Sequence, residues 1–303
     1  MVGIKIGYPC INLRIGCRSD KTFRLKSYSE KRLIETVDNN LDCLLRILKF
    51  NYEHNILFFR ITSDLIPFAS HPICRFNWQN HFKKKFEEIG EFIMRTGMRI
   101  SMHPDQFTLI NSIDEEVFQR SVKELSYHAQ VLELMKLDTT AKIQIHIGGA
   151  YGDKRESMRR FIKRFYQLDD QIARRLTIEN DDKIFSFQDC LDVSRETEIP
   201  IVFDVFHHSL NNSGESISQV FEKLVRTWST DKDGVPMVDY SSRKRGGSPR
   251  QHAESIDLKH FKSFIKESRP YDFDIMLEIK DKERSALKAV KIAMDDPRFI
   301  KVS

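Results

Sequence analysis

The sequence predicts an α/β protein that folds as one (β/α)8 TIM barrel over residues 1–303. Short apolar segments alternate with amphipathic segments eight times along the chain, which is typical of parallel strands connected by helices. No low-complexity linker or change of composition divides the chain, and its 303 residues suit one barrel. An open doubly wound sheet is the alternative fold, but no glycine-rich phosphate loop follows the first predicted strand.

The predicted strands share one pattern, because each is a short apolar run of the kind that is buried on both faces in a parallel sheet. In chain order they cover residues 5–9, 56–62, 99–103, 142–147, 176–179, 199–206, 236–240 and 273–279. The segments between them repeat apolar residues at helical spacing, as Leu33, Val37, Leu41, Leu44 and Leu48 do in the first segment. We therefore expect helices at residues 29–50, 82–94, 115–135, 158–168, 186–195, 216–228, 258–266 and 285–294.

The composition excludes several classes of protein. Hydrophobic residues make up 40% of the chain and charged residues 31%, which is ordinary for a globular protein and unlike a fibrous or disordered one. No apolar run reaches the roughly 18–20 residues of a membrane span, and the first residues lack the pattern of a secretory signal. The 5 cysteines are scattered without metal-type spacing, so we expect reduced thiols in an intracellular protein.

The chain is mildly basic. Its 49 Lys and Arg residues and 44 Asp and Glu residues give a net charge of +5, which permits a nucleic-acid partner without requiring one. Basic side chains cluster at residues 83–85, 159–164 and 243–250. Each cluster is compatible either with a solvated surface or with contacts to phosphates.

Histidines and carboxylates recur where the predicted strands end, and the carboxyl ends of barrel strands meet at the face that holds barrel active sites. The residues of this kind are His103, His146, Glu179, Asp204, His207, Asp239, His252 and Glu278. Burying such groups together without partners is costly, and shared divalent cations remove that cost. Imidazole and carboxylate ligands suit Mn²⁺ or Zn²⁺, and two cations bridged by Glu179 would suit in-line hydrolysis of a phosphodiester.

Seven longer motifs occur in order along nearly the whole chain. They are GYPCIN at 7–12, IPFASHP at 66–72, SMHPDQF at 101–107, HIGGAYGDK at 146–154, ENDD at 179–182, FDVFHH at 203–208 and MLEIKDKE at 276–283. In these motifs the sequence resembles the UV damage endonuclease family. The resemblance implies a TIM barrel similar to endonuclease IV, with two or three manganese ions at the strand ends and Zn²⁺ as the alternative metal.

The same resemblance implies an endonuclease that acts on double-stranded DNA containing UV lesions. Such an enzyme cuts immediately 5′ of cyclobutane pyrimidine dimers and (6-4) photoproducts and leaves a 3′-hydroxyl. We expect a monomer that does not associate with membranes.

Carried over position by position, the resemblance implies roles for individual residues. The implied metal ligands are His103, His146, Glu179, Asp204, His207, His252 and Glu278, and the implied catalytic residues are Glu179, Asp204, Glu278 and His71. Gln106 and Phe107 would wedge into the duplex where damaged bases are flipped out, although a turn residue followed by a core aromatic is the alternative interpretation. Tyr8 and Asn12 would line the lesion pocket. The expected phosphate contacts are Arg243, Lys244 and Arg245.

The chain departs from the family pattern at the end of the seventh strand. Many members carry Lys-x-His there, with a modified lysine and a histidine ligand, whereas this chain has Met237, Val238 and Asp239. Alternation along the strand predicts that Asp239 points into the barrel mouth, with Met237 one layer deeper. We therefore expect Asp239 to replace the histidine as a carboxylate ligand.

Two other functions remain open from the sequence. A metal-dependent sugar isomerase or epimerase would use the same fold and ligand types, and fold alone does not separate the chemistries. Gln106, Phe107 and the basic segment 243–250 favour the endonuclease, because a small-sugar pocket does not need them. A module that binds damage without cutting it would have lost its ligands, and only the seventh strand is altered.

Overall fold

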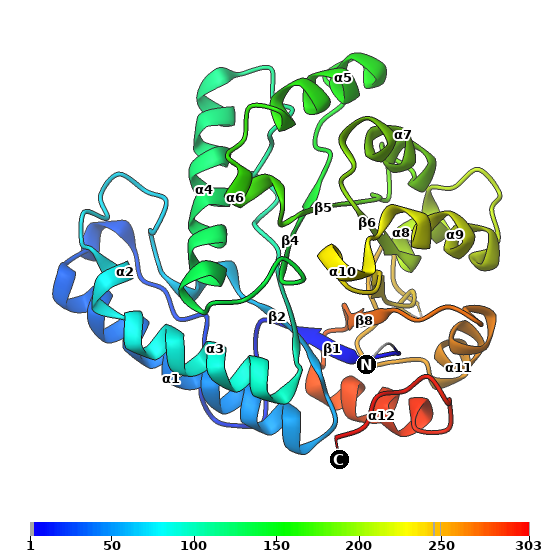
Figure 1. The fold of residues 1–303 in the computed structure, drawn as a ribbon, viewed down its shortest axis with the longest axis horizontal. Helices are drawn as coiled ribbons and strands as arrows, with labels where there is room; N and C mark the ends of the chain where they lie inside the picture. Colours follow the sequence, from blue (N-terminus) through cyan, green and yellow to red (C-terminus); the bar gives the residue numbers. More distant parts are fainter. Residues whose placement is uncertain (1–2, 245, 249, 303) are drawn as a thin grey trace.

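The computed structural model describes residues 3–244, 246–248 and 250–302. In these residues eight parallel strands close into a barrel, and each strand pairs with its neighbours in chain order (Figure 1). The strands are β1 (Ile6–Pro9), β2 (Phe58–Ile61), β3 (Arg99–Met102), β4 (Lys142–His146), β5 (Leu176–Glu179), β6 (Ile201–Asp204), β7 (Met237–Tyr240) and β8 (Asp274–Leu277). The barrel closes where β1 pairs with β8, with Ile6 opposite Ile275.

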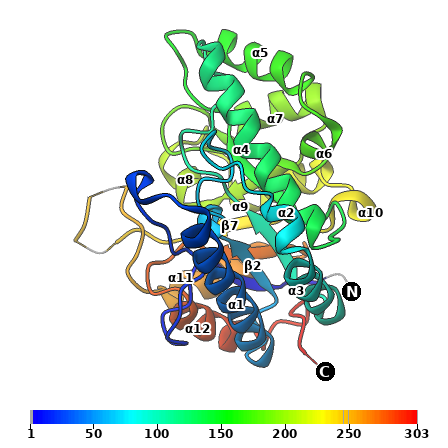
Figure 2. The same ribbon diagram turned by 90° about the vertical axis from the view of Figure 1, so that its left-hand side faces the viewer.

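Helices connect the strands and surround them (Figures 1 and 2). They are α1 (Glu30–Glu53), α2 (Trp78–His81), α3 (Lys83–Thr96), α4 (Glu115–Leu134), α5 (Lys154–Phe165), α6 (Asp170–Ala173), α7 (Phe187–Thr197), α8 (Val205–Leu210), α9 (Ile217–Leu224), α10 (Thr230–Asp233), α11 (Leu258–Glu267) and α12 (Glu283–Ala293). Short 3₁₀ turns lie at Leu25–Ser27, Ser63–Leu65 and Val225–Thr227. The expected closed barrel is therefore confirmed.

Local sequence signals set the ends of many helices. Ser186 caps α7 and exchanges hydrogen bonds with Asp189 in a capping box, and Ser216 and Gln219 form the same arrangement at α9. Helix α3 ends at Gly97, whose φ of 63° lies in the left-handed region that glycine adopts without strain. Such signals explain why the observed helices begin and end within a few residues of most predicted ones.

The core occupies the space between the strands and the helices. Every residue of β1, β2 and β3 is buried, as expected for a parallel sheet covered on both faces. Helix α3 packs closely beside α4, since a Cβ on Gly90 would lie 1.8 Å from the backbone oxygen of Met135. Figure 1 shows α1 and α3 running side by side along one flank of the barrel.

The two ends of the barrel differ. The chain termini lie together at the amino-terminal end of the strands, where Ile4 forms a parallel bridge with Phe299. Figure 2 shows the loop before α1 and the loop between β7 and α11 extending from the opposite side of the molecule. These two loops follow the carboxyl ends of β1 and β7, so they belong to the face where the sequence predicts the site.

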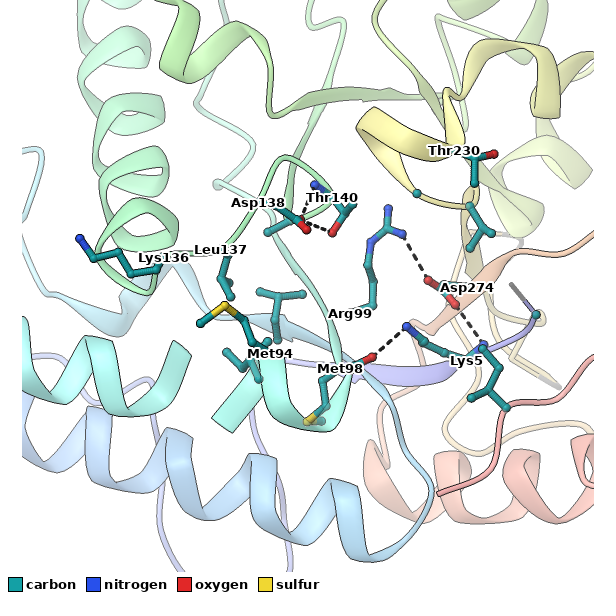
Figure 3. Close-up of a pocket in the computed structure, with 18 residues that line it drawn as sticks. Lys5, Met94, Met98, Arg99, Lys136, Leu137, Asp138, Thr140, Thr230 and Asp274 are labelled. Atoms are coloured by element: carbon teal, nitrogen blue, oxygen red, sulfur yellow. Dashed lines mark hydrogen bonds and ion pairs between the residues drawn. The ribbon is translucent and has the colours of Figure 1, made fainter. Parts of the chain in front are cut away.

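A cavity of about 530 Å³ lies at the amino-terminal end of the strands (Figure 3). Two of its charged groups pair with each other, since Arg99 contacts Asp274 at 3.4 Å, and Asp274 also accepts a hydrogen bond from the Lys5 backbone. Arg99 donates a second hydrogen bond to the backbone oxygen of Asp233. The cavity is thus remote from the strand-end residues and has a structural charge network of its own.

The cysteine expectation is wrong for one pair. Cys17 and Cys43 form a disulfide that joins the loop before α1 to the helix itself, while Cys10, Cys74 and Cys190 are free. The two bonded residues are 26 positions apart, and only the folding of the loop onto α1 brings them together. Among the described residues, no helix is long and apolar enough to cross a bilayer.

Candidate metal centre

Residues from the ends of β3 to β8 meet at the carboxyl end of the barrel. Within the part of the chain that the structure describes, they form three groups, in each of which the candidate ligand atoms lie within 4.8 Å of one another. The groups are His103, His146 and Glu179; Glu179, Asp204 and His207; and Asp204, Asp239 and Glu278. Glu179 and Asp204 each belong to two groups, so the three groups form one continuous cluster.

Glu179 lies at the middle of the cluster and is 1% exposed. His103 Nε2 and His146 Nε2 approach its Oε2 atom at 3.4 and 3.5 Å, and His207 Nδ1 approaches Oε1 at 3.2 Å. Burial raises the pKa of Glu179, but His146, His103 and His207 outweigh it and hold the pKa well below its usual value. Glu179 is therefore a buried anion that faces three imidazoles.

The junction of β6 and α8 places two more candidate ligands. The predicted strand reaches residue 206, but β6 ends at Asp204 because its carboxylate caps α8 and accepts a hydrogen bond of 2.7 Å from the His207 backbone. This cap turns the chain so that the His207 ring lies against Glu179. Asn180 fixes the Asp204 backbone through both its N–H and its carbonyl oxygen.

The protonation of this cluster reflects its crowded charges. Burial raises the pKa of Asp204 well above its usual value, and the carboxylates of Glu179 and Glu278 add to the effect. Burial lowers the pKa of His207, but the carboxylates of Asp204 and Glu179 raise it to about 11. The metal-free cluster therefore holds protons that a divalent cation would displace.

The orientation of several side chains fits a divalent metal ion. In the described part of the chain, Asp204 Oδ2 and His146 Nδ1 are buried and have no hydrogen-bond partner. His103 Nδ1 and His252 Nδ1 lie 2.7 and 3.1 Å from backbone oxygens, which leaves each Nε2 for another partner. Imidazole and carboxylate donors in this ratio suit a manganese- or zinc-type ion.

His252 lies at the rim of the cluster. Its ring is 6.0 Å from the ring of His207 and 4.8 Å from that of Phe206, measured between centroids. It belongs to none of the three groups found among the described residues. The structure thus brings His252 beside the centre, at a greater distance from the carboxylates than the other histidines.

Asp239 points into the barrel, as strand alternation predicts, and it contacts two residues that the sequence analysis missed. Both of its carboxylate oxygens lie 2.7 Å from Arg60 Nη2, and Gln144 Nε2 donates to Oδ2 at 2.6 Å. Arg60 Nη1 also contacts Glu278 Oε1 at 2.5 Å. A charged residue in the buried run Phe58–Ile61 was the signal that could have revealed Arg60.

Gln106 and Phe107 lie on the loop between β3 and α4 and both are exposed. Phe107 is 72% exposed, so the alternative interpretation as a core aromatic is wrong. Asp105 accepts a hydrogen bond from the Phe107 backbone at 2.8 Å, which shapes the loop. Gln106 borders a hollow of about 300 Å³ that His103 and His146 also line.

Other predicted site residues lie farther from the centre or are closed off. Tyr8 is fully buried, and its hydroxyl contacts Asn51 and Asn12 at 2.6 and 2.8 Å, so neither Tyr8 nor Asn12 is open to a ligand in this structure. His71 is exposed on the segment between β2 and α2, where its Nδ1 accepts a hydrogen bond from the Ile73 backbone.

The basic loop between β7 and α11 reaches back to the centre. Arg243 is exposed and forms a bridge with His252, so the two residues are linked through their backbones. Lys244 pairs with Glu254 at 2.8 Å, and Arg250 pairs with Asp182 at 2.9 Å. Arg245 lies outside the described residues.

The fold and this cluster define a TIM-barrel protein with a candidate divalent-metal centre at the carboxyl ends of its strands. The sequence matches the family described as UV-endonuclease UvdE over residues 4–302, and the chain belongs to that family. It is therefore a DNA repair endonuclease, and so a hydrolase.

Known relatives agree with this assignment. The chain is 39% identical to a UV DNA damage endonuclease of Clostridium perfringens, with 95% of this chain and 70% of that protein covered. It is 34% identical to a UV DNA damage endonuclease of Bacillus thuringiensis, with 91% and 89% covered. The crystal structure of SacUVDE matches with a TM-score of 0.93 at 45% identity, over 97% of this chain and 99% of that chain.

More distant structures share the fold alone. Endonuclease IV of Thermus thermophilus has a TM-score of 0.56 at 14% identity, with 82% of this chain and 92% of that chain covered. D-psicose 3-epimerase of Clostridium cellulolyticum has a TM-score of 0.55 at 10% identity, with 85% and 94% covered. The barrel therefore does not separate endonuclease from epimerase, and the family membership decides for the endonuclease.

Proposed function

We propose that the protein incises double-stranded DNA immediately 5′ of cyclobutane pyrimidine dimers and (6-4) photoproducts and leaves a 3′-hydroxyl. The observation that carries the proposal is the position of Glu179, which faces His103 and His146 with one oxygen and His207 with the other. A carboxylate shared by two groups of ligand atoms is suited to bridge two divalent ions, which is an arrangement used for phosphodiester hydrolysis.

The proposed metal is Mn²⁺, with Zn²⁺ as the alternative and two or three ions per chain. The residues that would hold the ions are His103, His146, Glu179, Asp204, His207, Asp239, His252 and Glu278. When bound, such ions lower the pKa of water and stabilise negative charge on a phosphate. The protein's own part is to hold Glu179, Asp204 and Glu278 in place as catalytic carboxylates, and Asn180 fixes the Asp204 backbone through two hydrogen bonds.

The proposed recognition of damage depends on the exposed pair Gln106 and Phe107. A flat aromatic ring on a loop can fill the space in the stack from which damaged bases have been extruded. A UV lesion stacks poorly, so extruding it costs less than extruding intact bases. The hollow beside Gln106 is open toward the histidines of the centre and supports this arrangement.

We further propose that Arg243, Lys244 and Arg245 contact backbone phosphates and that His71 approaches the scissile phosphate. Arg243 is exposed beside His252, which is consistent with DNA crossing this loop on its way to the centre. Tyr8 and Asn12 are buried, with the Tyr8 hydroxyl bonded to both Asn12 and Asn51 of α1, so contact with a lesion would require these side chains to rearrange. The proposed partner is duplex DNA, and the protein would bind it as a monomer. An enzyme with this substrate would act inside the cell, in the compartment that holds the genome.

Nicking of supercoiled plasmid tests this function. With Mn²⁺, irradiated plasmid should be nicked well above an untreated control, and chelation should abolish the nicking. Equal nicking of irradiated and untreated plasmid would exclude a damage-specific enzyme. Nicking that persists after complete removal of metal would exclude the metal centre.

A further inference from the structure

We propose that Arg60 is a fixed cation that takes the place of a metal ion at the Asp204, Asp239 and Glu278 group, so that the centre binds two divalent ions. The inference rests on the proposed metal centre, specifies how many ions it holds, and makes Asp239 and Glu278 partners of Arg60 in place of ligands of a third ion. It assigns Arg60 as a positioning residue, since its contacts are to Asp239 and Glu278.

The three candidate groups differ in chemistry. Two of them combine histidine with Glu179, whereas the third consists of carboxylates only. In that third group the guanidinium of Arg60 already contacts two of the three members, at 2.7 Å for Asp239 and 2.5 Å for Glu278. Among the described residues, no lysine or arginine forms an ion pair with Glu179 or Asp204, the carboxylates of the two histidine groups.

Arg60 is held rigidly in this position. It is 3% exposed and belongs to β2, where it pairs in register with Pro9 of β1. Gln144 accepts a hydrogen bond from Arg60 Nη2 at 2.8 Å, and its amide nitrogen donates to both Glu179 and Asp239 at 2.6 Å. These hydrogen bonds fix the orientation of the Gln144 amide. The amide thereby connects the guanidinium of Arg60 to the carboxylate of Glu179.

A guanidinium does not lose its proton in a protein, so this positive charge is permanent. A divalent ion bound between Asp239 and Glu278 would lie against this charge without intervening water. The same contacts suit an aspartate at position 239, because a carboxylate accepts hydrogen bonds from Arg60 with both oxygens, whereas a neutral imidazole has only one acceptor nitrogen.

Charge balance supports two ions. Glu179, Asp204, Asp239 and Glu278 provide four carboxylates, whose charge two divalent cations would neutralise. Arg60 then leaves one positive charge in the barrel beneath the centre, which favours a bound phosphate. A third divalent ion would add two further positive charges beside a guanidinium.

The test is the number of Mn²⁺ ions bound per chain, measured by elemental analysis and calorimetry on the full chain without DNA. The wild type should bind two ions. Arg60→Met removes the charge at similar length, so Asp204, Asp239 and Glu278 should take up a third ion. Arg99→Met is the matched control, because Arg99 is equally buried and pairs with Asp274 at the other end of the barrel. It should leave the count at two.

Three ions in the wild type, or two in a folded Arg60→Met protein, would overturn the assignment of Arg60. Arg60→Gln is a second variant for the case in which Arg60→Met does not fold. Its side chain is neutral but can still donate a hydrogen bond to a carboxylate, and the Arg60→Gln protein should also bind three ions. If neither variant folds, a wild-type count of three would still overturn the assignment. A wild type that binds no ion would instead remove the proposed metal centre on which the inference rests.

Discussion

Glu179 Oε1 lies 3.2 Å from Nδ1 of His207, across the gap between the end of β5 and helix α8. The other oxygen of Glu179 faces His103 and His146. One carboxylate therefore joins the two histidine groups of the candidate metal centre. This relationship makes Glu179 the residue on which metal binding and incision should both depend.

Glu179→Gln keeps the size of the side chain but removes the charge that would hold two cations together. We expect bound Mn²⁺ to fall and incision of irradiated DNA to drop by several orders of magnitude, while binding of damaged duplex largely persists. Glu222→Gln on the exposed surface of α9 is the control and should leave metal content and incision unchanged. A Glu179→Gln protein with full incision would contradict the metal model.

Replacing Gln106 and Phe107 together by alanine separates recognition from chemistry. Base–aromatic stacking is worth roughly 1–3 kcal/mol, so the preference for damaged over intact duplex should fall about 10-fold or more. Metal content should stay the same. Ile113→Ala is the control, because Ile113 is an apolar residue of the same connection and is 67% exposed. Unchanged selectivity in the double variant would refute the role of the pair.

Metal binding should release protons. Burial lowers the pKa of His207, but Asp204 and Glu179 raise it to about 11, so the free imidazole is protonated at neutral pH. An ion that takes this ligand must displace the proton, and affinity for Mn²⁺ should rise with pH. Calorimetry in buffers of different ionisation enthalpy measures the protons released. Mn²⁺ binding without proton release would mean that His207 is not a ligand.

Asp296 should stabilise the metal-free fold except at low pH. Burial raises its pKa, but Arg298 and Arg269 outweigh burial and lower it to about 2. A depressed carboxyl pKa gives stability that is present above the unfolded value of 3.8 and is lost as pH falls toward 2. The contribution is about 2 kcal/mol.

Urea unfolding at pH 7 and at pH 2–3 measures this contribution. Asp296→Asn should lower the free energy of unfolding at pH 7 and flatten its dependence on acid pH. Asp295→Asn, at the exposed neighbouring position, should change neither. Equal free energies of unfolding for the wild type and Asp296→Asn at pH 7 would contradict the stabilising role of Asp296.

The barrel and most of the candidate ligands could be predicted because each depends on a local pattern. Short apolar runs marked the strands, and His103, His146 and Glu179 stand at strand ends, which a parallel barrel brings to one face. The helix α8 was missed because the apolar run continues past Asp204. Only the side chain of Asp204, acting as a cap, ends the strand there.

The contacts of Arg60 could not be predicted in the same way. Both faces of a barrel strand are buried, so the apolar pattern of Phe58–Ile61 does not reveal which side chains point inward. The contact of Tyr8 with Asn51 of α1 and the pairing of Cys17 with Cys43 likewise depend on how separate segments of the chain fold together. A charged residue within a buried run is a local sign of Arg60, but its partners, like the other two features, arise from contacts between distant segments.

The most direct test of the account maps incision on a duplex that carries one cyclobutane pyrimidine dimer at a defined position. With Mn²⁺, the labelled strand should be cut at the phosphodiester immediately 5′ of the dimer, and a polymerase should extend the product because it ends in a 3′-hydroxyl. The undamaged duplex of the same sequence should remain intact. Cutting at other positions, or equal cutting of the undamaged duplex, would contradict the account.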